Sequence, residues 1–336
     1  PFGYAAQQGG PFPQYGGAPV PPRRRRPSPL KFLAALFGTF TIMVLAYVLL
    51  SYGGNGSSSD GSSGSHNGSY ANEDYEVPPA DTSPSEIPQP ETYSEATQWM
   101  EDNPVYGASV AEPVRCDLDA LDMSTATDAQ LEDHLNELTA CLMRVWGPTL
   151  RDAGYEAVRP TVTVYDSEIS TPCGDMPMGN AAYCMVDQQV YYATDLAEVV
   201  PDELSGVPYT ADAVMAHEFG HAVQARTGIL YSEKAWESRV GSSQADEFSR
   251  RTEVQADCFA GEFIGSVSES LALTPSDTDG LSQMFYAFGD DVLTGDSSYR
   301  GSHGHGTNRR EWFQDGLDDR SLATCNAFTA ADSRVR

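Results

Sequence analysis

Apolar residues recur at helical spacing in the part of the chain that follows residue 110. Leucines and one valine are three or four residues apart between positions 131 and 145, which predicts a helix. Thr127–Gln130 has a capping-box pattern at its start, and we expect Gly147-Pro148 to end it. His134 lies on the polar flank of this helix, so we expect it at the surface.

Two more helices and two strands follow in the hydrophobic pattern. Ala211 to Arg226 carries an apolar stripe beside polar positions, and Arg251 to Leu271 carries aromatic and aliphatic residues that can pack inward. Thr161 to Tyr165 and Val186 to Ala193 alternate β-branched and aromatic residues with others, as strands do. We therefore expect one folded domain over residues 105–336.

A long apolar segment of another kind precedes this domain. Residues 30–52 carry no charge from Phe32 onward and are long enough to cross a bilayer as a helix. Arg23–Arg26 and Lys31 come before it, which predicts a single-pass signal anchor with a cytoplasmic N-terminus and an extracytoplasmic domain. The alternative is a cleaved signal peptide, whose apolar core is normally shorter. Residues 1–29 lack apolar periodicity, and we expect a disordered cytoplasmic tail.

Composition and charge add a linker and exclude one class of partner. Residues 53–104 are rich first in Gly and Ser and then in Pro and acidic residues, so we expect a disordered stalk. The chain has a formal net charge of −28, and every acidic residue lies beyond position 52. An acidic surface repels phosphate backbones, which argues against nucleic acid as a partner.

All 6 cysteines follow the predicted anchor, on the side expected to be extracytoplasmic. An even number in an oxidising compartment predicts disulfides, although sequence alone does not choose among the pairings. Our working assignment joins Cys173 with Cys184, Cys116 with Cys141, and Cys258 with Cys325. No cysteine has a recognisable nucleophile context, which disfavours a cysteine protease.

The candidate chemistry lies in the run His217-Glu218-Phe219-Gly220-His221. Two histidines four residues apart lie one above the other on a helix, where both can bind one metal ion. Glu218 between them is placed to act as a general base on a metal-bound water. Because so short a pattern is only moderately specific, its meaning depends on the structural context around it.

A catalytic zinc site needs a third protein ligand and one position open to water. The metzincin arrangement requires Gly and His where this chain has Gln224 and Thr227, so that class is excluded. Glu253 on the second helix can supply the third ligand, and Asp257, one turn later, can accept a hydrogen bond from a ligand histidine. The alternative is that both are surface acids on a solvated helix face.

Several motifs resemble the putative neutral zinc metallopeptidase family. The resemblance rests on His217–Gln224, Glu253–Gly261 and a later His-Gly followed by Trp312-Phe313, with further similarity at Tyr183-Cys184 and Gly289–Asp291. It runs through most of residues 105–328. It implies an α+β, zincin-like domain with a small antiparallel or mixed sheet and active-site helices, and one zinc ion bound by His217, His221 and Glu253.

The later His-Gly motif has two possible matches, because the chain contains both His303-Gly304 and His305-Gly306. The distance to Trp312 favours His303, whereas the threonine after Gly306 favours His305. Either histidine can reach the active site and donate a hydrogen bond to the developing oxyanion. The alternative is that both lie on a solvent-exposed loop.

The expected function is hydrolysis of peptide or protein substrates by a membrane-anchored zinc metallopeptidase, with Glu218 as general base. We expect the strand around Gln189–Ala193 to pair with an extended peptide substrate. Two alternatives remain: a non-proteolytic zincin-like ectodomain that serves as a binding or scaffold module, and a metal-free structural protein of the envelope. The intact Glu218 argues against the binding module, since a structural zinc site needs no general base.

Overall fold

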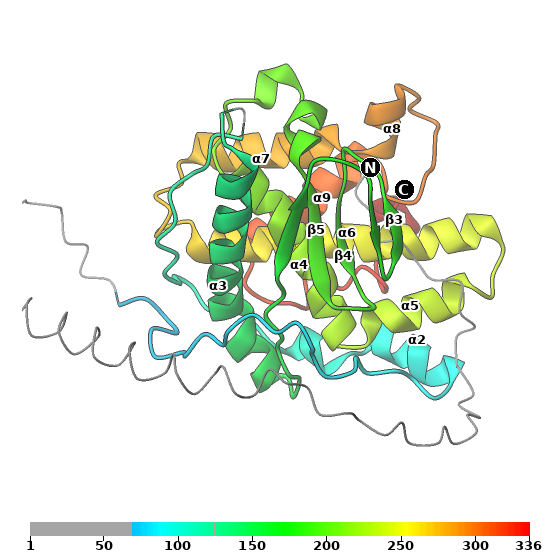
Figure 1. Cartoon of the computed structure of the whole chain (residues 1–336). Coiled ribbons are helices and arrows are strands. Elements are labelled where there is room, and N and C mark those ends of the chain that lie inside the picture. The colour runs from blue at the N-terminus through cyan, green and yellow to red at the C-terminus, as the bar shows by residue number, and fades with distance from the viewer. Residues whose placement is uncertain (1–68, 124) are drawn as a thin grey trace, which may run out of the picture. The chain divides into compact units, whose positions relative to one another are not determined.

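The computed structural model describes residues 69–123 and 125–336, which combine helices with two small sheets (Figure 1). The helices are α2 (Tyr93–Glu101), α3 (Asp128–Asp152), α4 (Thr210–Arg226), α5 (Ile229–Glu237), α6 (Ser242–Val267), α7 (Pro275–Ala287), α8 (Asp290–Thr294) and α9 (Gly306–Asp318). The strands are β1 (Val162–Tyr165), β2 (Ile169–Thr171), β3 (Gly174–Met176), β4 (Ala181–Cys184) and β5 (Gln189–Ala193). Short 3-10 helices cover Pro104–Gly107, Thr194–Val199, Asp202–Leu204 and Asp332–Arg334. This is the α+β arrangement that the sequence predicts.

The predicted tail and anchor, residues 1–29 and 30–52, lie outside the described residues. The first part of the predicted stalk, residues 53–68, lies outside them as well. Among the residues that are described, no helix is both long enough and apolar enough to span a bilayer.

The larger sheet is mixed, with the strand order β1-β5-β4. β5 runs parallel to β1 and antiparallel to β4, so that Val190 lies opposite Val162 on one side and Tyr183 on the other. The expectation that this strand pairs with a substrate peptide is wrong, because its backbone groups on both sides already belong to the sheet. Within this sheet β1 and β4 are the edge strands.

β4 separates two apolar clusters, because successive side chains of a strand point to opposite faces. Ala181 and Tyr183 belong to the main core formed with the helices, whereas Ala182 and Cys184 pack with the β2–β3 hairpin. The Cys173–Cys184 disulfide joins this hairpin to the end of β4. The larger sheet therefore has helices on one face and the hairpin on the other.

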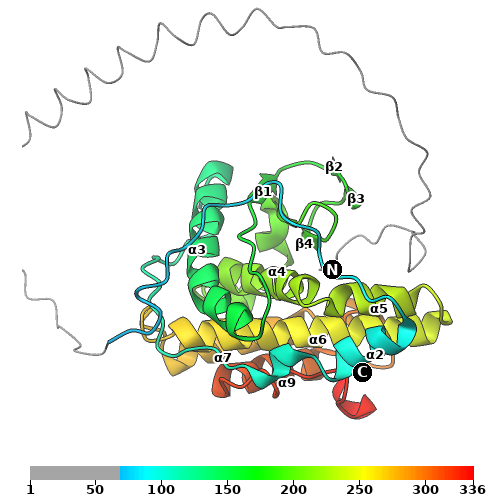
Figure 2. The same ribbon diagram turned by 90° about the horizontal axis from the view of Figure 1, so that it is seen from below.

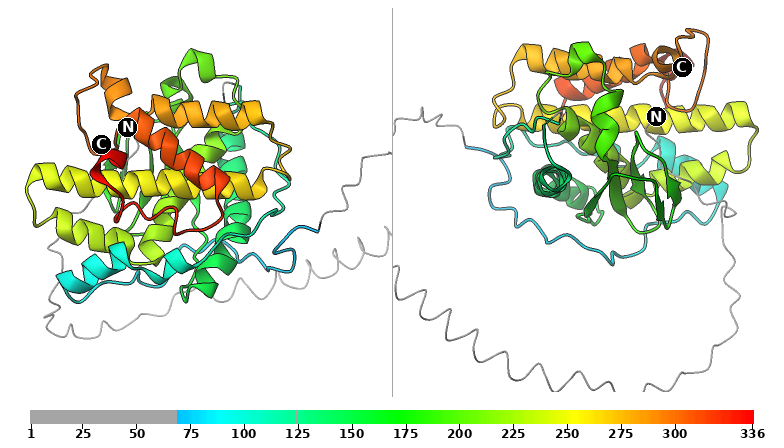
Figure 3. Two further views of the ribbon diagram at one scale, coloured as in Figure 1. Left: turned by 180° about the vertical axis from the view of Figure 1, so that it is seen from behind. Right: turned by 45° about the horizontal axis from the view of Figure 1, so that its top comes forward.

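α4 lies between β4 and α6, and α9 packs on the other side of α6 (Figures 2 and 3). Glycines permit these close helix contacts. A Cβ on Gly220 of α4 would lie 3.1 Å from Cα of Ala256 in α6, and one on Gly316 of α9 would lie 1.9 Å from the carbonyl oxygen of Cys258. The first contact brings the histidine face of α4 next to the acidic face of α6.

α3 begins at the predicted capping box, in which Thr127 and Gln130 bond each other's backbone N–H groups. The expectation that the helix ends at Gly147-Pro148 is wrong, since it continues to Asp152. Proline lacks the N–H that would bond the carbonyl of Arg144. Nδ2 of Asn72 donates to this carbonyl at 2.9 Å and satisfies it from another part of the chain.

Residues 69–104 lie along the domain (Figure 1), so the expectation of a disordered stalk is wrong for this segment. Thr92 caps α2, whose Ala96 and Met100 are buried. Arg226 at the end of α4 donates to the carbonyl of Ser85 (2.9 Å), and Nδ2 of Asn103 donates to that of Thr227 (3.1 Å). The proline-rich, acidic composition concealed these contacts because each joins the segment to a residue more than 100 positions away.

The three disulfides of the described residues join Cys116 with Cys141, Cys173 with Cys184, and Cys258 with Cys325, which confirms the working assignment. His134 contradicts its assignment to the surface, since its side chain is 8% exposed. Its Nε2 lies 3.1 Å from a carboxylate oxygen of Asp212, in the first turn of α4. The polar flank of α3 therefore faces a buried acid on α4.

Candidate metal centre

α4 and α6 place three potential metal ligands together. His217 and His221 lie one turn apart on α4, and Glu253 faces them from α6. One donor atom from each of these buried residues lies within 4.8 Å of the others. Among the described residues, they are the group of this kind that the structure assembles.

The two nitrogens of each histidine ring face different partners, as in a metal site, where one nitrogen binds the ion and the other donates a hydrogen bond. Nε2 of His217 lies 3.4 Å and Nε2 of His221 lies 3.6 Å from carboxylate oxygens of Glu253. The other nitrogen of each ring, Nδ1, contacts a residue that is not one of the three potential ligands. Nδ1 of His217 lies 2.8 Å from Oδ1 of Asp257, and Nδ1 of His221 lies 2.8 Å from Oε1 of Gln224. Since Nδ1 supplies a proton to these acceptors, each ring, when neutral, turns the lone pair of its Nε2 toward the other two residues. Two imidazole nitrogens and one carboxylate are a ligand set typical of catalytic zinc.

Asp257 lies where the spacing on α6 predicts, next to His217. Arg309 of α9 donates to both of its carboxylate oxygens, from Nε and Nη2 at 2.8 Å each. Burial alone would raise the pKa of Asp257, but Arg309 and His217 outweigh it and lower that pKa. The carboxylate therefore stays ionised and can hold the Nδ1 proton of His217.

Opposite charges meet at the centre of the cluster. Burial would raise the pKa of Glu253, but the hydrogen bond from His217 and the charges of the nearby histidines lower it. Burial would also lower the pKa of His217, yet Asp257 and Glu253 raise it to about 10. Burial lowers the pKa of His221 to about 4. Glu253 and Asp257 stay ionised, and a bound cation would take the place of the proton that they hold on His217.

Glu218 points toward the sheet, where its Oε2 accepts a hydrogen bond from the backbone N–H of Tyr183 in β4 at 2.8 Å. Its other oxygen, Oε1, is buried and has no hydrogen-bond partner within the described part of the chain. Burial raises the pKa of Glu218 to about 7, helped by the charge of Glu253 and opposed by His217. A carboxyl group with this pKa can both accept and release a proton near neutral pH.

Comparison of the sequence with known proteins identifies the family of the chain. A family model described as "Putative neutral zinc metallopeptidase" matches residues 111–328. The chain belongs to this family. The matched range contains His217, Glu218, His221, Glu253 and Asp257 but not residues 69–104, which lie along the domain.

Relatives of the chain include proteins described as uncharacterized. One from Mycobacterium tuberculosis strain H37Rv is 31% identical over 208 residues, which cover 56% of this chain and 67% of the relative. The uncharacterized protein YpfJ of Escherichia coli K12 is 29% identical over 216 residues, which cover 61% of this chain and 75% of that protein. No solved structure matches the chain.

The two histidines of the later His-Gly motif differ in their surroundings. His303 is bonded through Nδ1 to Asp290 at 3.2 Å and is one of the residues that lower the pKa of Glu253. His305 precedes α9 and uses Nε2 to donate to the carbonyl of Tyr299 at 2.8 Å. Of the two histidines, His303 is therefore the one that affects a residue of the cluster.

Three contributors to the centre were missed from the sequence. Arg309, Gln224 and the backbone N–H of Tyr183 each bond a cluster residue. Gln224 could have been found, because it lies three residues after His221 and so on the same helix face. Arg309 and Tyr183 are remote in sequence from their partners, so no local pattern reveals these two contacts, although Tyr183-Cys184 is among the motifs that resemble the family. A cavity of about 500 Å³, lined by residues such as Tyr75, contains none of the cluster residues.

Proposed function

We propose that the chain is a zinc-dependent peptidase that hydrolyses peptide bonds in peptide or protein substrates. The observation that carries this proposal is the convergence of the His217 and His221 Nε2 atoms on Glu253, with Glu218 buried beside them. Family membership supports it. The ligand set would hold one zinc ion and leave a position open.

Zinc, when bound, lowers the pKa of a water and polarises the scissile carbonyl. Glu218 would accept the proton of the attacking water at Oε1, the oxygen that has no partner among the described residues. It would then deliver that proton to the leaving amine. Tyr183 would keep the carboxyl group oriented through Oε2, and His303 would donate a hydrogen bond to the developing oxyanion.

We propose that a substrate peptide pairs with β4, and not with β5 as the sequence pattern predicts. β4 is an edge strand of its sheet, and the N–H of Tyr183 leaves it on the side away from β5, toward Glu218. An extended peptide that follows this edge would bring its scissile bond to the general base. This placement supports a substrate that binds in extended form.

We also propose that residues 30–52 anchor the chain in the membrane and that the peptidase domain lies on the extracytoplasmic side. The basic residues that precede the apolar segment support this orientation. Three disulfides within the domain fit an oxidising compartment.

Zinc content and peptide cleavage of the purified full chain test the proposed function. We expect one zinc per chain and cleavage of a peptide library that a chelator abolishes. Glu218→Gln should keep the zinc and lose cleavage, whereas Glu132→Gln, at an exposed position of α3, should keep both. A wild-type chain that binds zinc and cleaves nothing would instead support the non-proteolytic binding module. Equal cleavage by Glu218→Gln and the wild type would refute the role of Glu218.

A further inference from the structure

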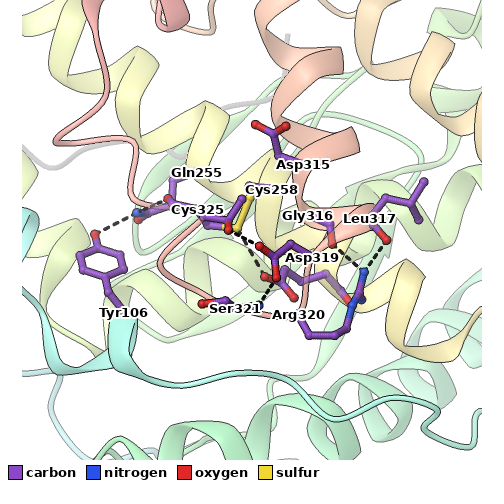
Figure 4. The surroundings of a disulfide bond; sticks show 12 residues. Tyr106, Gln255, Cys258, Asp315, Gly316, Leu317, Asp319, Arg320, Ser321 and Cys325 are labelled. Atoms are coloured by element: carbon purple, nitrogen blue, oxygen red, sulfur yellow. Dashed lines mark hydrogen bonds between the residues drawn. A yellow bond between two sulfur atoms is a disulfide. The ribbon is translucent and has the colours of Figure 1, made fainter.

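A row of buried amide side chains leads away from the metal centre. His221 is bonded to Gln224 (2.8 Å), and Nε2 of Gln224 lies 3.1 Å from Oε1 of Gln255 in α6. Nε2 of Gln255 in turn donates to the carbonyl of Cys325 (3.0 Å) and to Oη of Tyr106 (2.9 Å), as Figure 4 shows. Both glutamine side chains are fully buried.

The outer end of this row can only accept hydrogen bonds. The carbonyl oxygen of Cys325 has no proton to give. The hydroxyl of Tyr106 donates its proton to the carbonyl of Met100 at 2.8 Å, so it receives the proton of Gln255. The NH₂ group of Gln255 must therefore face Cys325 and Tyr106, and its Oε1 must face Gln224.

The orientation of Gln255 fixes that of Gln224, and through it the tautomer of His221. Nε2 of Gln224 donates to Oε1 of Gln255 and also to the carbonyl of Thr252 at 2.8 Å. Its Oε1 therefore faces His221, and a carboxamide oxygen can only accept. His221 must then carry its proton on Nδ1, which leaves Nε2 unprotonated toward Glu253. Turning over Gln255 would place donor against donor, and turning over Gln224 would place acceptor against acceptor, in a buried site.

A disulfide holds the outer end in place. Cys325 is bonded to Cys258, which lies three residues after Gln255 and thus on the same side of α6. The C-terminal segment that contains Cys325 is in this way fixed beside Gln255 (Figure 4).

We propose that Gln255 is a positioning residue for the metal centre, which sets the tautomer and ring orientation of His221 through Gln224. This inference rests on the proposed function, because it assumes that His221 binds zinc. The Cys258–Cys325 disulfide is part of the same arrangement, since it fixes the carbonyl that orients Gln255.

The test combines metal affinity with a direct measurement of the tautomer, both on the full chain. Zinc affinity is measured by competition with a chelating dye, and the protonated ring nitrogen of His221 is identified from ¹⁵N chemical shifts of the metal-free protein. Gln255→Met removes both polar ends at similar length. Gln98→Met, at an exposed position of α2, is the matched control.

We expect Gln255→Met to weaken zinc binding about 10-fold, the lower end of the range for residues that orient a ligand. His221 should then populate both tautomers in the metal-free variant. Tyr106→Phe removes only the hydroxyl and leaves the Cys325 carbonyl in place, so we expect zinc affinity to fall by about 3-fold. This variant tests the same claim if Gln255→Met does not fold. The control should match the wild type in both measurements.

The two measurements separate the two claims. No zinc binding by the wild type would refute the proposed function, while the tautomer of the metal-free protein still tests the role of Gln255. Zinc binding by the wild type with unchanged affinity and tautomer in Gln255→Met and Tyr106→Phe would overturn the inference. A lower unfolding temperature alone, with affinity and tautomer unchanged, would reduce Gln255 to a structural role and would likewise overturn it.

Discussion

Arg309 is expected to be one of the most sensitive positions outside the metal ligands. Its side chain is 1% exposed and forms two hydrogen bonds of 2.8 Å with Asp257, which is 0% exposed. Its Nη1 also donates to the carbonyl of Phe288 at 3.2 Å. Replacing Arg309 with Met leaves a buried carboxylate without its cation.

Removal of one partner of a buried ion pair typically costs about 3–5 kcal/mol. For Arg309→Met we expect a loss of this size in the free energy of unfolding, because both partners are fully buried. For a domain of this size the loss corresponds to about 10 °C in melting temperature. The assay is urea and thermal unfolding of the purified chain with a chelator present, so that metal binding does not contribute to the measured stability.

Arg310→Met is the matched control, since it removes the same type of side chain from the next position of α9. The guanidinium of Arg310 lies over the ring of Tyr286, which is partly exposed. We expect the control to change stability by less than about 1 kcal/mol, the upper end for exposed cation–π contacts. A loss below about 1 kcal/mol for Arg309→Met would refute the reasoning, because Asp257 would then not depend on this arginine.

Two further predictions concern contacts remote from the metal centre. Asn72→Gly keeps the positive φ at that position but removes the hydrogen bond to the carbonyl of Arg144. We expect it to lower the free energy of unfolding by about 1 kcal/mol more in the wild type than in the Pro148→Ala variant, because alanine at position 148 restores the missing helix N–H. Additive losses in unfolding experiments would contradict this. The pKa of His134 is raised from 6.5 because the hydrogen bond and charge of Asp212 outweigh burial. The stability that the His134–Asp212 pair contributes is complete below pH 6.5 and is lost as the pH rises through the higher folded-state pKa of His134. The difference in unfolding free energy between the wild type and His134→Gln should therefore shrink above pH 6.5. A difference that stays constant from pH 5 to 9 would refute the pairing of a protonated His134 with Asp212.

The helices that carry the site were predictable because they rely on local pattern. The apolar stripe and the four-residue spacing placed His217 and His221 on α4, and the same spacing placed Glu253 and Asp257 on α6. The start of α6 was missed because its first residues, from Ser242 on, carry no apolar periodicity.

Contacts between distant segments were not predictable in the same way. Asn72 satisfies the carbonyl that Pro148 leaves free, 72 residues from its partner Arg144, and no local signal indicates this. His134 was assigned to the surface because histidine is often exposed, whereas Asp212 provides a buried partner 78 residues away.

The order of the strands is the clearest failure of local reasoning. Gln189–Ala193 has the composition of a strand, and the structure confirms that it is one. Composition does not say which strands lie beside it, and both of its edges are covered. The strand whose backbone reaches Glu218 is β4, a short segment that begins with two alanines and has no alternating pattern that predicts a strand.

Metal stoichiometry tests the central claim most directly. We predict one zinc per chain for the purified wild type, and less than about one tenth of that for His221→Ala and for Glu253→Gln, because each removes one of three ligands. Glu132→Gln should retain the full amount. Zinc that stays at one equivalent in Glu253→Gln, or that is absent from the wild type, would contradict the account.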